Sequence, residues 1–516
     1  MTAQRGVIEI SRRHNPFSTT GVSRDGSGVP HYDGLPATLL DLLADQVEHR
    51  PDSEAVVELG ADRVTYRQLW ERAARVAGGL HAAGLRRGDR VGVRYPAGLD
   101  WVLAFWGALM AGGIPVAVNT RSAAPEVAFV LSDAGAGIDL APGSPLPDGD
   151  PYLVDGRDRT DIAALFYTSG TTGSPKGVPI THEAFLTNAE NLVRCMGQSR
   201  GIGEELRTLI SVPLFHVTGC NSQLLAAAYA GGAAVIMPAL DLPGLIEVLP
   251  AERISSLITV PAVYALLLRH PGFAGADISG VRWVGYGGAP IAPSLVKALQ
   301  NAFETGSVFN GYGMTETASL MTALPDDEAF EHADSVGYAM PSGDIGVLPL
   351  DSDPDNPGTG ELVVRGANVM GGYWKRPDAT AATVVDGWLH TGDVVRVDDA
   401  GRVHIIDRLK DIIIRGGENV SSVEVEAALL AAPGVADACV LAVPDEVMGE
   451  KVGAVLVGDA HGVDVAVVLK HCGSQLADFK VPQYITVVTD ALPRTASGKL
   501  LKGQLREQVQ WGPPLR

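Results

Sequence analysis

Short apolar runs alternate with longer amphipathic stretches from about residue 35 to residue 350. The runs are Arg90–Arg94, Ile162–Tyr167, Leu209–Val212, Ser256–Val260 and Val281–Tyr286. Strands that are separated by helices of roughly ten to fifteen residues imply crossover connections and mostly parallel sheets. We therefore predict an α/β fold for this region, in which ligands bind at the carboxyl ends of the strands.

The segment Trp101–Val118 carries no charge and needs a test as a membrane span. Pro115 and the pair Gly112-Gly113 divide it into a helix of about a dozen residues and a short strand, which is too little to cross a bilayer. Leu224–Met237 repeats this layout of small-residue helix, Gly-Gly and β-branched strand. We predict buried segments in both places, in two related α/β layers, and no membrane span.

The pattern changes around residues 337–406, where short β-rich pieces are separated by Gly, Pro and Asp turns. These pieces predict a small antiparallel sheet or barrel. A unit that begins near Asp411 mixes one helix with strands: Ser422–Ala431, then Ala438–Val443, Val452–Val457 and Tyr484–Val488. We expect a large N-terminal domain over residues 35–408, a smaller α+β domain over residues 409–516, and a boundary at Asp407–Asp411.

Two further segments carry weaker predictions. Residues 1–34 are polar and are expected to form a loosely ordered lead-in. The stretch Leu131–Asp161 is expected to be a short linker that shapes one side of the cleft.

Composition narrows the class of protein. The 516 residues are 46% hydrophobic and 19% charged, as in a multidomain globular protein. The net charge of −20 argues against nucleic acid and anionic membranes as partners. Four widely spaced cysteines without a metal-type spacing, and an N-terminus without an apolar signal region, predict a reduced, cytoplasmic chain. The oligomeric state stays open, and a homodimer is compatible with this sequence.

The stretch Tyr167–Gly177, YTSGTTGSPKG, contains five Ser and Thr hydroxyls, three glycines and one lysine at the end of a predicted buried strand. Backbone N–H groups, hydroxyl donors and a cation together suit a polyphosphate. Thr181 is placed to cap a helix near Glu183. The sequence GxxxxGK[ST] is absent, which disfavours a P-loop NTPase.

This loop resembles the phosphate loop of the adenylate-forming superfamily, which contains acyl-CoA synthetases, peptide synthetase adenylation domains and luciferases. Further matching motifs follow in the order of the family over about residues 35–505: Leu214–Gly219, Gly285–Pro290, Asn310–Thr317, Glu361–Gly366, His390–Asp393, Asp407–Val420 and Leu492–Lys499. The resemblance implies that a carboxylate attacks the α-phosphorus of ATP and expels pyrophosphate, after which a thiol attacks the acyl-adenylate and expels AMP.

The resemblance assigns the chemistry to a few residues. Lys499 matches the catalytic lysine, which offsets charge between carboxylate and phosphate. Glu316 matches the Mg²⁺ ligand, with Thr168 beside it, and Thr315 is expected to reach the α-phosphate. Lys410 matches the hinge about which a mobile C-terminal domain rotates between the half-reactions.

The resemblance also implies binding residues for ATP and for coenzyme A. Tyr312 matches the residue that packs on adenine, opposite Gly288, Ala289 and Pro290. The remaining matches are Thr168, Ser169, Gly170, Thr171, Thr172, Gly173 and Lys176 for the phosphates, Asn310 and Gly311 beside adenine, Asp393 and Arg408 for the ribose, and Gly416 and Gly417 for the pantetheine arm.

The acid and the thiol are less well determined by sequence. His216 stands where amino-acid-activating relatives usually carry an aspartate, and a neutral imidazole cannot replace that charge, which favours a non-amino acid. The residues expected around the acyl pocket are small or apolar: Val217, Thr218, Cys220, Tyr286, Gly287 and Ala318–Met321. Fatty, aryl and bulky terpenoid or polyketide acids stay open. Coenzyme A is the expected acceptor, with a carrier-protein phosphopantetheine, a one-half-reaction enzyme or a non-catalytic nucleotide-binding relative as alternatives.

Overall fold

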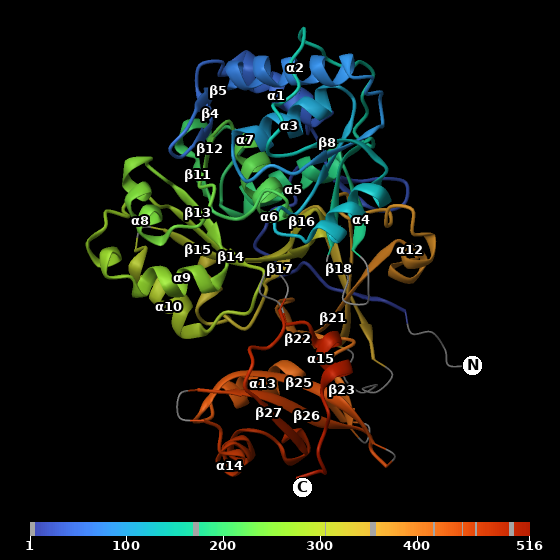
Figure 1. The fold of residues 1–516 in the computed structure, drawn as a ribbon, viewed down its shortest axis with the longest axis vertical. Helices are drawn as coiled ribbons and strands as arrows, with labels where there is room; N and C mark the ends of the chain where they lie inside the picture. Colours follow the sequence, from blue (N-terminus) through green and yellow to red (C-terminus); the bar gives the residue numbers. More distant parts are fainter. Residues whose placement is uncertain are drawn as a thin grey trace.

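The computed structural model describes residues 6–168, 175–304, 306–350, 358–415, 418–445, 447–459, 462–494 and 500–515. A large upper lobe holds two α/β sheets and an antiparallel sheet, and the C-terminal residues form a smaller lobe below it (Figure 1). This is the predicted fold class.

Within the described residues, nine strands form a central sheet in the order β17-β16-β15-β14-β13-β11-β12-β4-β5. Their bounds are β4 (Glu54–Glu58), β5 (Arg63–Thr65), β11 (Arg207–Ile210), β12 (Ala233–Ile236), β13 (Ser256–Thr259), β14 (Trp283–Gly287), β15 (Ser307–Met314), β16 (Ser319–Leu324) and β17 (Tyr338–Ala339). The strands from β15 to β4 are parallel, and the outer strands are antiparallel.

Helices cover both faces of this sheet, and the period-two alternation of the strands explains why. Leu209 and Leu257 pack under one group of helices, while their neighbours Ile210 and Ile258 belong to the core on the opposite face. The first group is α8 (Leu242–Ala251), α9 (Pro261–Arg269) and α10 (Pro293–Ala302); the second includes α1 (Leu39–His49), α5 (His182–Cys195) and α7 (Ala226–Ala230).

A second sheet runs β10-β9-β7-β6-β8 in the described chain. Its strands are β6 (Arg90–Val93), β7 (Ile114–Ala117), β8 (Ala136–Leu140), β9 (Ile162–Thr168) and β10 (Lys176–Thr181). The helices of this part of the chain are α2 (Tyr66–Ala82), α3 (Leu99–Met110) and α4 (Ala124–Ala134). The predicted linker at Leu131–Asp161 is therefore wrong in part. It contains the end of α4 and all of β8, because Leu140 is buried and β8 pairs with β6.

The two helix, Gly-Gly and strand units lie in different sheets, as predicted. One is α3 with β7, and the other is α7 with β12. Both helices are buried among other elements, and no helix in the described ranges is long and apolar enough to cross a membrane.

The predicted β-rich region is an antiparallel sheet, which runs β1-β18-β19-β21-β20 with β22 on β21. Its strands are β1 (Ile8–Glu9), β18 (Gly343–Pro349), β19 (Thr359–Gly366), β20 (Val384–Val385), β21 (Trp388–Val397) and β22 (Val403–Arg408), with α12 (Pro377–Thr383) beside them.

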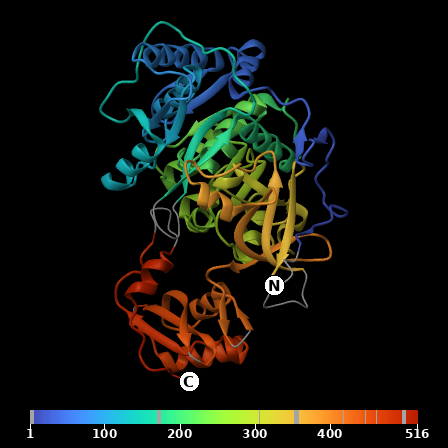
Figure 2. The same cartoon turned by 90° about the vertical axis from the view of Figure 1, so that its right-hand side faces the viewer.

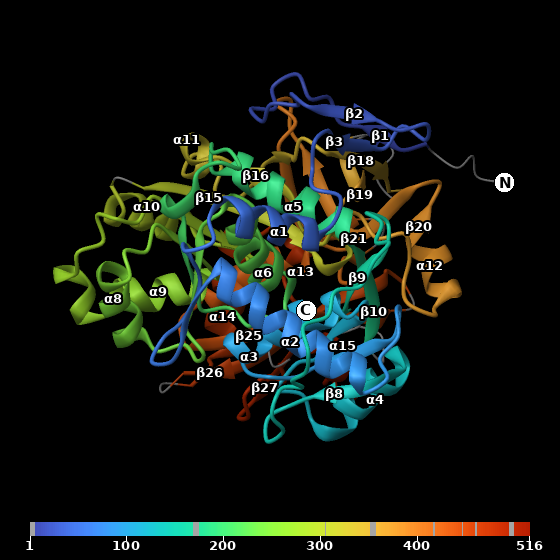
Figure 3. The same ribbon diagram turned by 90° about the horizontal axis from the view of Figure 1, so that it is seen from above.

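The prediction of a loosely ordered lead-in is wrong for residues 6–34. Strand β1 pairs with the edge strand β18, and β2 (Val22–Arg24) pairs with β3 (Pro30–Tyr32) beside it (Figure 3). The guanidinium of Arg12 donates to the carbonyls of Gly343 and Met340, at 2.8 and 2.6 Å. Burial of these contacts and covering of an open sheet edge order a segment whose own sequence is polar.

The C-terminal lobe has its own sheet and its own core (Figure 2). Strand β22 still pairs in the upper lobe, whereas β23 already belongs to the lower sheet. The lower elements are β23 (Ile413–Arg415), β24 (Glu418–Val420), α13 (Ser422–Leu430), β25 (Val435–Asp445), β26 (Gly449–Gly458), α14 (Val465–Gln475), β27 (Tyr484–Val488) and α15 (Lys502–Gln508). The chain thus changes sheets between Arg408 and Ile413.

Candidate active site

The glycine-rich loop closes an antiparallel hairpin. Thr168 ends β9, Lys176 begins β10, and the two residues are direct partners in the register. Helix α5 follows at His182, and the side chain of Thr181 accepts from the N–H of Ala184, which confirms the predicted cap. The hairpin therefore holds the hydroxyl of Thr168 beside the stem of Lys176. The predicted phosphate ligands Ser169–Gly173 lie outside the described residues.

The turn Thr315–Thr317, labelled η4, lies against both β9 and β10. It carries Thr315 and Glu316, so two motifs that are far apart in sequence meet at this hairpin. Directly after the turn, Ala318 and Ser319 have φ values of 53° and 120°. Residues other than glycine rarely adopt such values, and they persist where the surrounding structure enforces them.

Buried amides enforce this conformation. The side-chain nitrogens of Asn188 and Asn368 both donate to the carbonyls of Thr317 and Leu320, at 2.9 to 3.2 Å. The amide of Asn221 donates to the carbonyl of Ala318 at 2.5 Å. These three residues, which we call the amide clamp, come from three separate segments. The sequence analysis missed them, because an isolated Asn in an apolar stretch has no pattern that indicates its partner.

Tyr312 and Asp393 join β15 to the antiparallel sheet. The Tyr312 hydroxyl donates to Oδ2 of Asp393 at 2.5 Å, and Oδ1 of Asp393 pairs with Nε of Arg408 at 2.7 Å. Burial of the hydroxyl, followed by the charge of Asp393, raises the pKa of Tyr312 well above its ordinary value. The structure thus brings together three residues that were predicted around the nucleoside.

The other predicted nucleoside residues lie at the carboxyl ends of neighbouring strands. Gly288, Ala289 and Pro290 follow β14 and are exposed, and β14 pairs with β15, which carries Tyr312. A side chain at Gly287 would meet the carbonyl oxygen of Gly311 at 2.2 Å, so glycine is required there. Asn310 is turned inward instead, and its amide donates to the carbonyl of Ser335 at 3.1 Å.

Tyr373 was missed by the sequence analysis, although it lies in the site. Its hydroxyl donates to Oε1 of Glu316 at 2.8 Å, and the ammonium of Lys176 lies 4.8 Å from the centre of its ring. Burial and the Glu316 charge raise the pKa of Tyr373. Tyr373 lies within residues 337–406, which the sequence analysis predicted only as a β-rich region.

Glu316, the predicted Mg²⁺ ligand, keeps acceptor positions open for a divalent cation. A carboxylate has about four acceptor positions, and the hydroxyl of Tyr373 uses one of them. Mg²⁺ on nucleotide phosphates needs only one or two protein carboxylates. No cluster of three His, Cys, Asp or Glu side chains that could bind a metal by itself exists in the described ranges.

The segments expected around the acyl group also meet. His216 precedes α6 (Val217–Gly219), which continues into the π-helix η2 (Cys220–Leu225). The hydroxyl of Ser222 is 2.7 Å from that of Ser319, so η2 packs on the strand after Glu316. His216 is exposed at the start of this segment, whereas Cys220 is buried, and burial raises the pKa of its thiol.

The expected hinge is tied to the last helix. The guanidinium of Arg506, on α15, donates to the carbonyl of Lys410 at 3.2 Å and pairs with Asp411 at 2.7 Å. Burial lowers the pKa of Lys410. Lys499, Gly416 and Gly417 lie outside the described residues.

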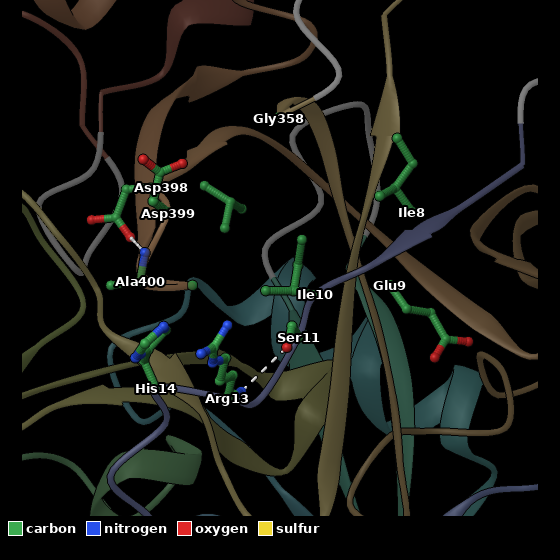
Figure 4. A pocket seen from close by; sticks show the side chains of 12 residues that line it. Ile8, Glu9, Ile10, Ser11, Arg13, His14, Gly358, Asp398, Asp399 and Ala400 are labelled. Carbon is green, nitrogen blue, oxygen red and sulfur yellow. Dashed lines mark hydrogen bonds between the residues drawn. The ribbon is translucent and has the colours of Figure 1, made fainter.

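A cavity of about 390 Å³ lies elsewhere, between the N-terminal segment and the turn from β21 to β22 (Figure 4). It is lined by residues such as Ile10, His14 and Asp398, and by none of the predicted site residues. The candidate site therefore rests on its charged and hydroxyl side chains and not on this cavity.

Comparison with known proteins shows the family of this chain. The family model described as AMP-binding enzyme matches residues 43–148 and 139–374, and the model of its C-terminal domain matches residues 424–499. A feruloyl-CoA synthase of Amycolatopsis sp is 37% identical over 480 residues, which cover 88% of this chain and 95% of the relative. A long-chain-fatty-acid–CoA ligase of Mycobacterium tuberculosis is 34% identical, over 90% of this chain and 97% of the relative.

A solved structure has the same architecture. O-succinylbenzoate coenzyme A synthetase from Bacillus subtilis, in complex with ATP and magnesium ion, has a TM-score of 0.81 and 29% identity, over 90% of this chain and 99% of that chain. The chain belongs to the adenylate-forming superfamily of AMP-binding enzymes, and within it to the AMP-forming acyl-CoA ligases.

Proposed function

We propose that this ligase activates a carboxylic acid with an uncharged aryl or alkyl body and transfers the acyl group to coenzyme A. The observation that carries the proposal is the meeting of strands β9 and β10 with the turn Thr315–Thr317 and of Tyr312 with Asp393, residues that come from three different sheets. Ligands of such folds bind at the carboxyl ends of the strands.

The first half-reaction brings a carboxylate against a polyphosphate. At an effective dielectric near 20, two like unit charges about 4 Å apart repel by about 4 kcal/mol, so cations have to be supplied. Lys176 supplies one beside the β- and γ-phosphates, with Thr168 and the loop Ser169–Gly173 as donors. Lys499 is proposed to bridge the attacking carboxylate and the α-phosphate, which Thr315 also contacts. Mg²⁺, held by Glu316 and Thr168, would neutralise phosphate charge when it is bound.

The nucleoside is proposed to lie between Tyr312 and the segment Gly288–Pro290. Asp393 is a fixed acceptor for the ribose hydroxyls, and Arg408 lies beside it. Asn310 is better regarded as a support of this strand, because its amide is already bonded to the carbonyl of Ser335.

The acyl side of the site favours an acid without further charge. Neither Ser211–Leu225 nor Ala318–Leu324, which pack together through Ser222 and Ser319, contains Asp, Glu, Lys or Arg. An ammonium or a second carboxylate buried there would lack a partner, which costs several kcal/mol. The similar feruloyl and long-chain-fatty-acid ligases act on acids whose bodies are also uncharged.

The second half-reaction requires a thiol to reach the acyl-adenylate. We propose coenzyme A as the acceptor, bound along Gly416 and Gly417 after the domain of residues 409–516 has rotated about Lys410 against residues 35–408. A carrier-protein phosphopantetheine is the second candidate, because it presents the same arm.

Four buried cysteines, all free in the described chain, support a reducing compartment such as the cytoplasm.

Exchange of labelled pyrophosphate into ATP tests the proposal, across a panel of cinnamate-like, benzoate-like, fatty and amino acids. We expect exchange with at least one uncharged aryl or alkyl acid, then thioester formation with coenzyme A. Exchange only with amino acids would contradict the substrate class. Thioester formation only with a holo carrier protein would contradict the proposed acceptor.

A further inference from the structure

The chain after β19 is attached to two parts of the site by its backbone. The N–H of Met370 donates to the carbonyl of Glu316 at 2.8 Å, and the N–H of Trp374 donates to the carbonyl of Gly177 at 2.8 Å. Tyr373 lies in this bridging segment, Met370–Trp374. The segment therefore connects the turn that carries Glu316 to the strand that carries Lys176.

The two ends of the Tyr373 side chain face two opposite charges. Its hydroxyl donates to the Glu316 carboxylate, and its ring face lies under the Lys176 ammonium. Lys176 and Glu316, both within the described ranges, form no ion pair with each other. An aromatic ring attracts a cation over its face, and a phenol donates to an anion at its edge, so one side chain serves both groups.

The position of Tyr373 is fixed by neighbours outside the site. Its N–H donates to the hydroxyl of Thr380 on α12 at 2.9 Å. Three residues after Tyr373, the side chain of Arg376 donates to Asp133 on α4 at 2.7 Å, and Asp133 also accepts from Tyr167 at 2.9 Å. These bonds fix the backbone around Tyr373 between α12 and α4, and the side chain itself is held by its contacts with Glu316 and Lys176.

We propose that Tyr373 is a positioning residue that keeps Glu316 and Lys176 apart and aimed at the nucleotide. A direct ion pair between these two side chains would neutralise both of them, and the incoming metal and phosphates would have to break it. The phenol hydroxyl instead orients the carboxylate for the cation, while the ring seats the ammonium for the phosphates. This inference rests on the proposed function, which assigns Glu316 to Mg²⁺ and Lys176 to the phosphates.

Two substitutions separate the two roles of the side chain. Tyr373→Phe removes the hydroxyl and keeps the ring, so it affects Glu316 alone. Tyr373→Leu removes both contacts. Tyr338→Phe is the matched control, because the hydroxyl of Tyr338 also donates to a carboxylate, that of Glu328 at 2.9 Å, and Glu328 is not a proposed site residue.

Binding measured by calorimetry, without turnover, is the main readout. For Tyr373→Phe we expect the dissociation constant of Mg-ATP to rise about tenfold, as for other residues that orient a metal ligand, with little change for ATP in EDTA. Tyr373→Leu is expected to weaken both. Tyr338→Phe is expected to match the wild type. Equal binding of Mg-ATP by Tyr373→Phe and the wild type would overturn the proposal.

A double-mutant cycle with Glu316→Gln adds a second test. If Tyr373 acts through Glu316, Tyr373→Phe should change Mg-ATP binding little once Glu316 is gone, whereas additive effects would contradict the assignment. Circular dichroism shows whether each variant is folded. Failure of the proposed function is distinguishable, because the wild type would then show no pyrophosphate exchange with any acid.

Discussion

The side chain of Asp393 bonds two other residues of the proposed nucleoside site. It accepts from Tyr312 on one oxygen and pairs with Arg408 on the other, and its side chain is only 4% exposed. Tyr312 comes from a parallel α/β sheet and Asp393 from the antiparallel sheet, so the bond aligns two sheets at the point where the ribose is proposed to bind.

We predict that Asp393→Asn raises the KM for ATP by about 10- to 100-fold, because bonds to a charged acceptor contribute about 1.5–3 kcal/mol. Steady-state kinetics of pyrophosphate exchange measures this change. Asp344→Asn is the control, since Asp344 is also buried and paired with two arginines, Arg24 and Arg365. It should lower stability and leave the KM for ATP unchanged. An equal rise in KM for both variants would contradict a specific role for Asp393.

At the scale of elements, the amide clamp holds Ala318 and Ser319, the two residues with positive φ values that follow η4. Asn188 belongs to α5, Asn221 to η2, and Asn368 follows β19. The carbonyls of Thr317 and Leu320 each accept from two of these amides. Loss of Asn188 or Asn368 alone therefore leaves both carbonyls bonded to the other amide, whereas loss of both residues removes all four of these bonds.

We predict that Asn188→Ala and Asn368→Ala are non-additive. Their double variant should lose about 1–3 kcal/mol more free energy of unfolding than the sum of the single variants, the cost of unbonded buried carbonyls. Denaturant titration measures it. Ala318→Gly should partly rescue the double variant, because glycine adopts a positive φ without strain. Strict additivity would show that the two amides do not share their acceptors.

At the scale of the whole molecule, the chain leaves the upper sheets at Arg408 and enters the lower sheet at Ile413. The intervening turn is closed by the N–H of Asp411, which donates to the carbonyl of Arg408 at 2.8 Å. Arg506 holds the carbonyl of Lys410. A rotation between the lobes thus has only a few residues in which to take place.

We predict that two variants separate the half-reactions. Lys499→Ala should abolish adenylate formation and largely spare thioester formation from a supplied acyl-adenylate. Lys410→Pro should slow thioester formation by about tenfold or more, since a fixed φ resists the rotation. Proline also restricts the backbone of the preceding residue, Leu409. The adenylation rate of Lys410→Pro is therefore measured as an internal control, because it shows whether this restriction disturbs the first half-reaction. Single-turnover assays of each step measure both effects. Equal loss of both steps in Lys499→Ala would contradict its role.

The sequence by itself determined the fold class, the order of the motifs and the nature of the chemistry. Strand and helix periodicity is local, so the runs at Arg90–Arg94 and Ile162–Tyr167 were placed correctly as strands. A dense cluster of glycine, hydroxyl and lysine residues, as in Tyr167–Gly177, also predicts a phosphate-binding loop from a few adjacent positions. The roles of the individual site residues remain predictions.

Only the tertiary structure decided which distant residues meet. Tyr373 and Glu316 are 57 positions apart, and Tyr312 and Asp393 are 81 apart. The polar N-terminal segment is ordered because it covers the edge of β18, a surface that its own sequence does not reveal. Contacts of this kind depend on how sheets and loops pack in space, and a single chain read residue by residue contains no periodic signal for them.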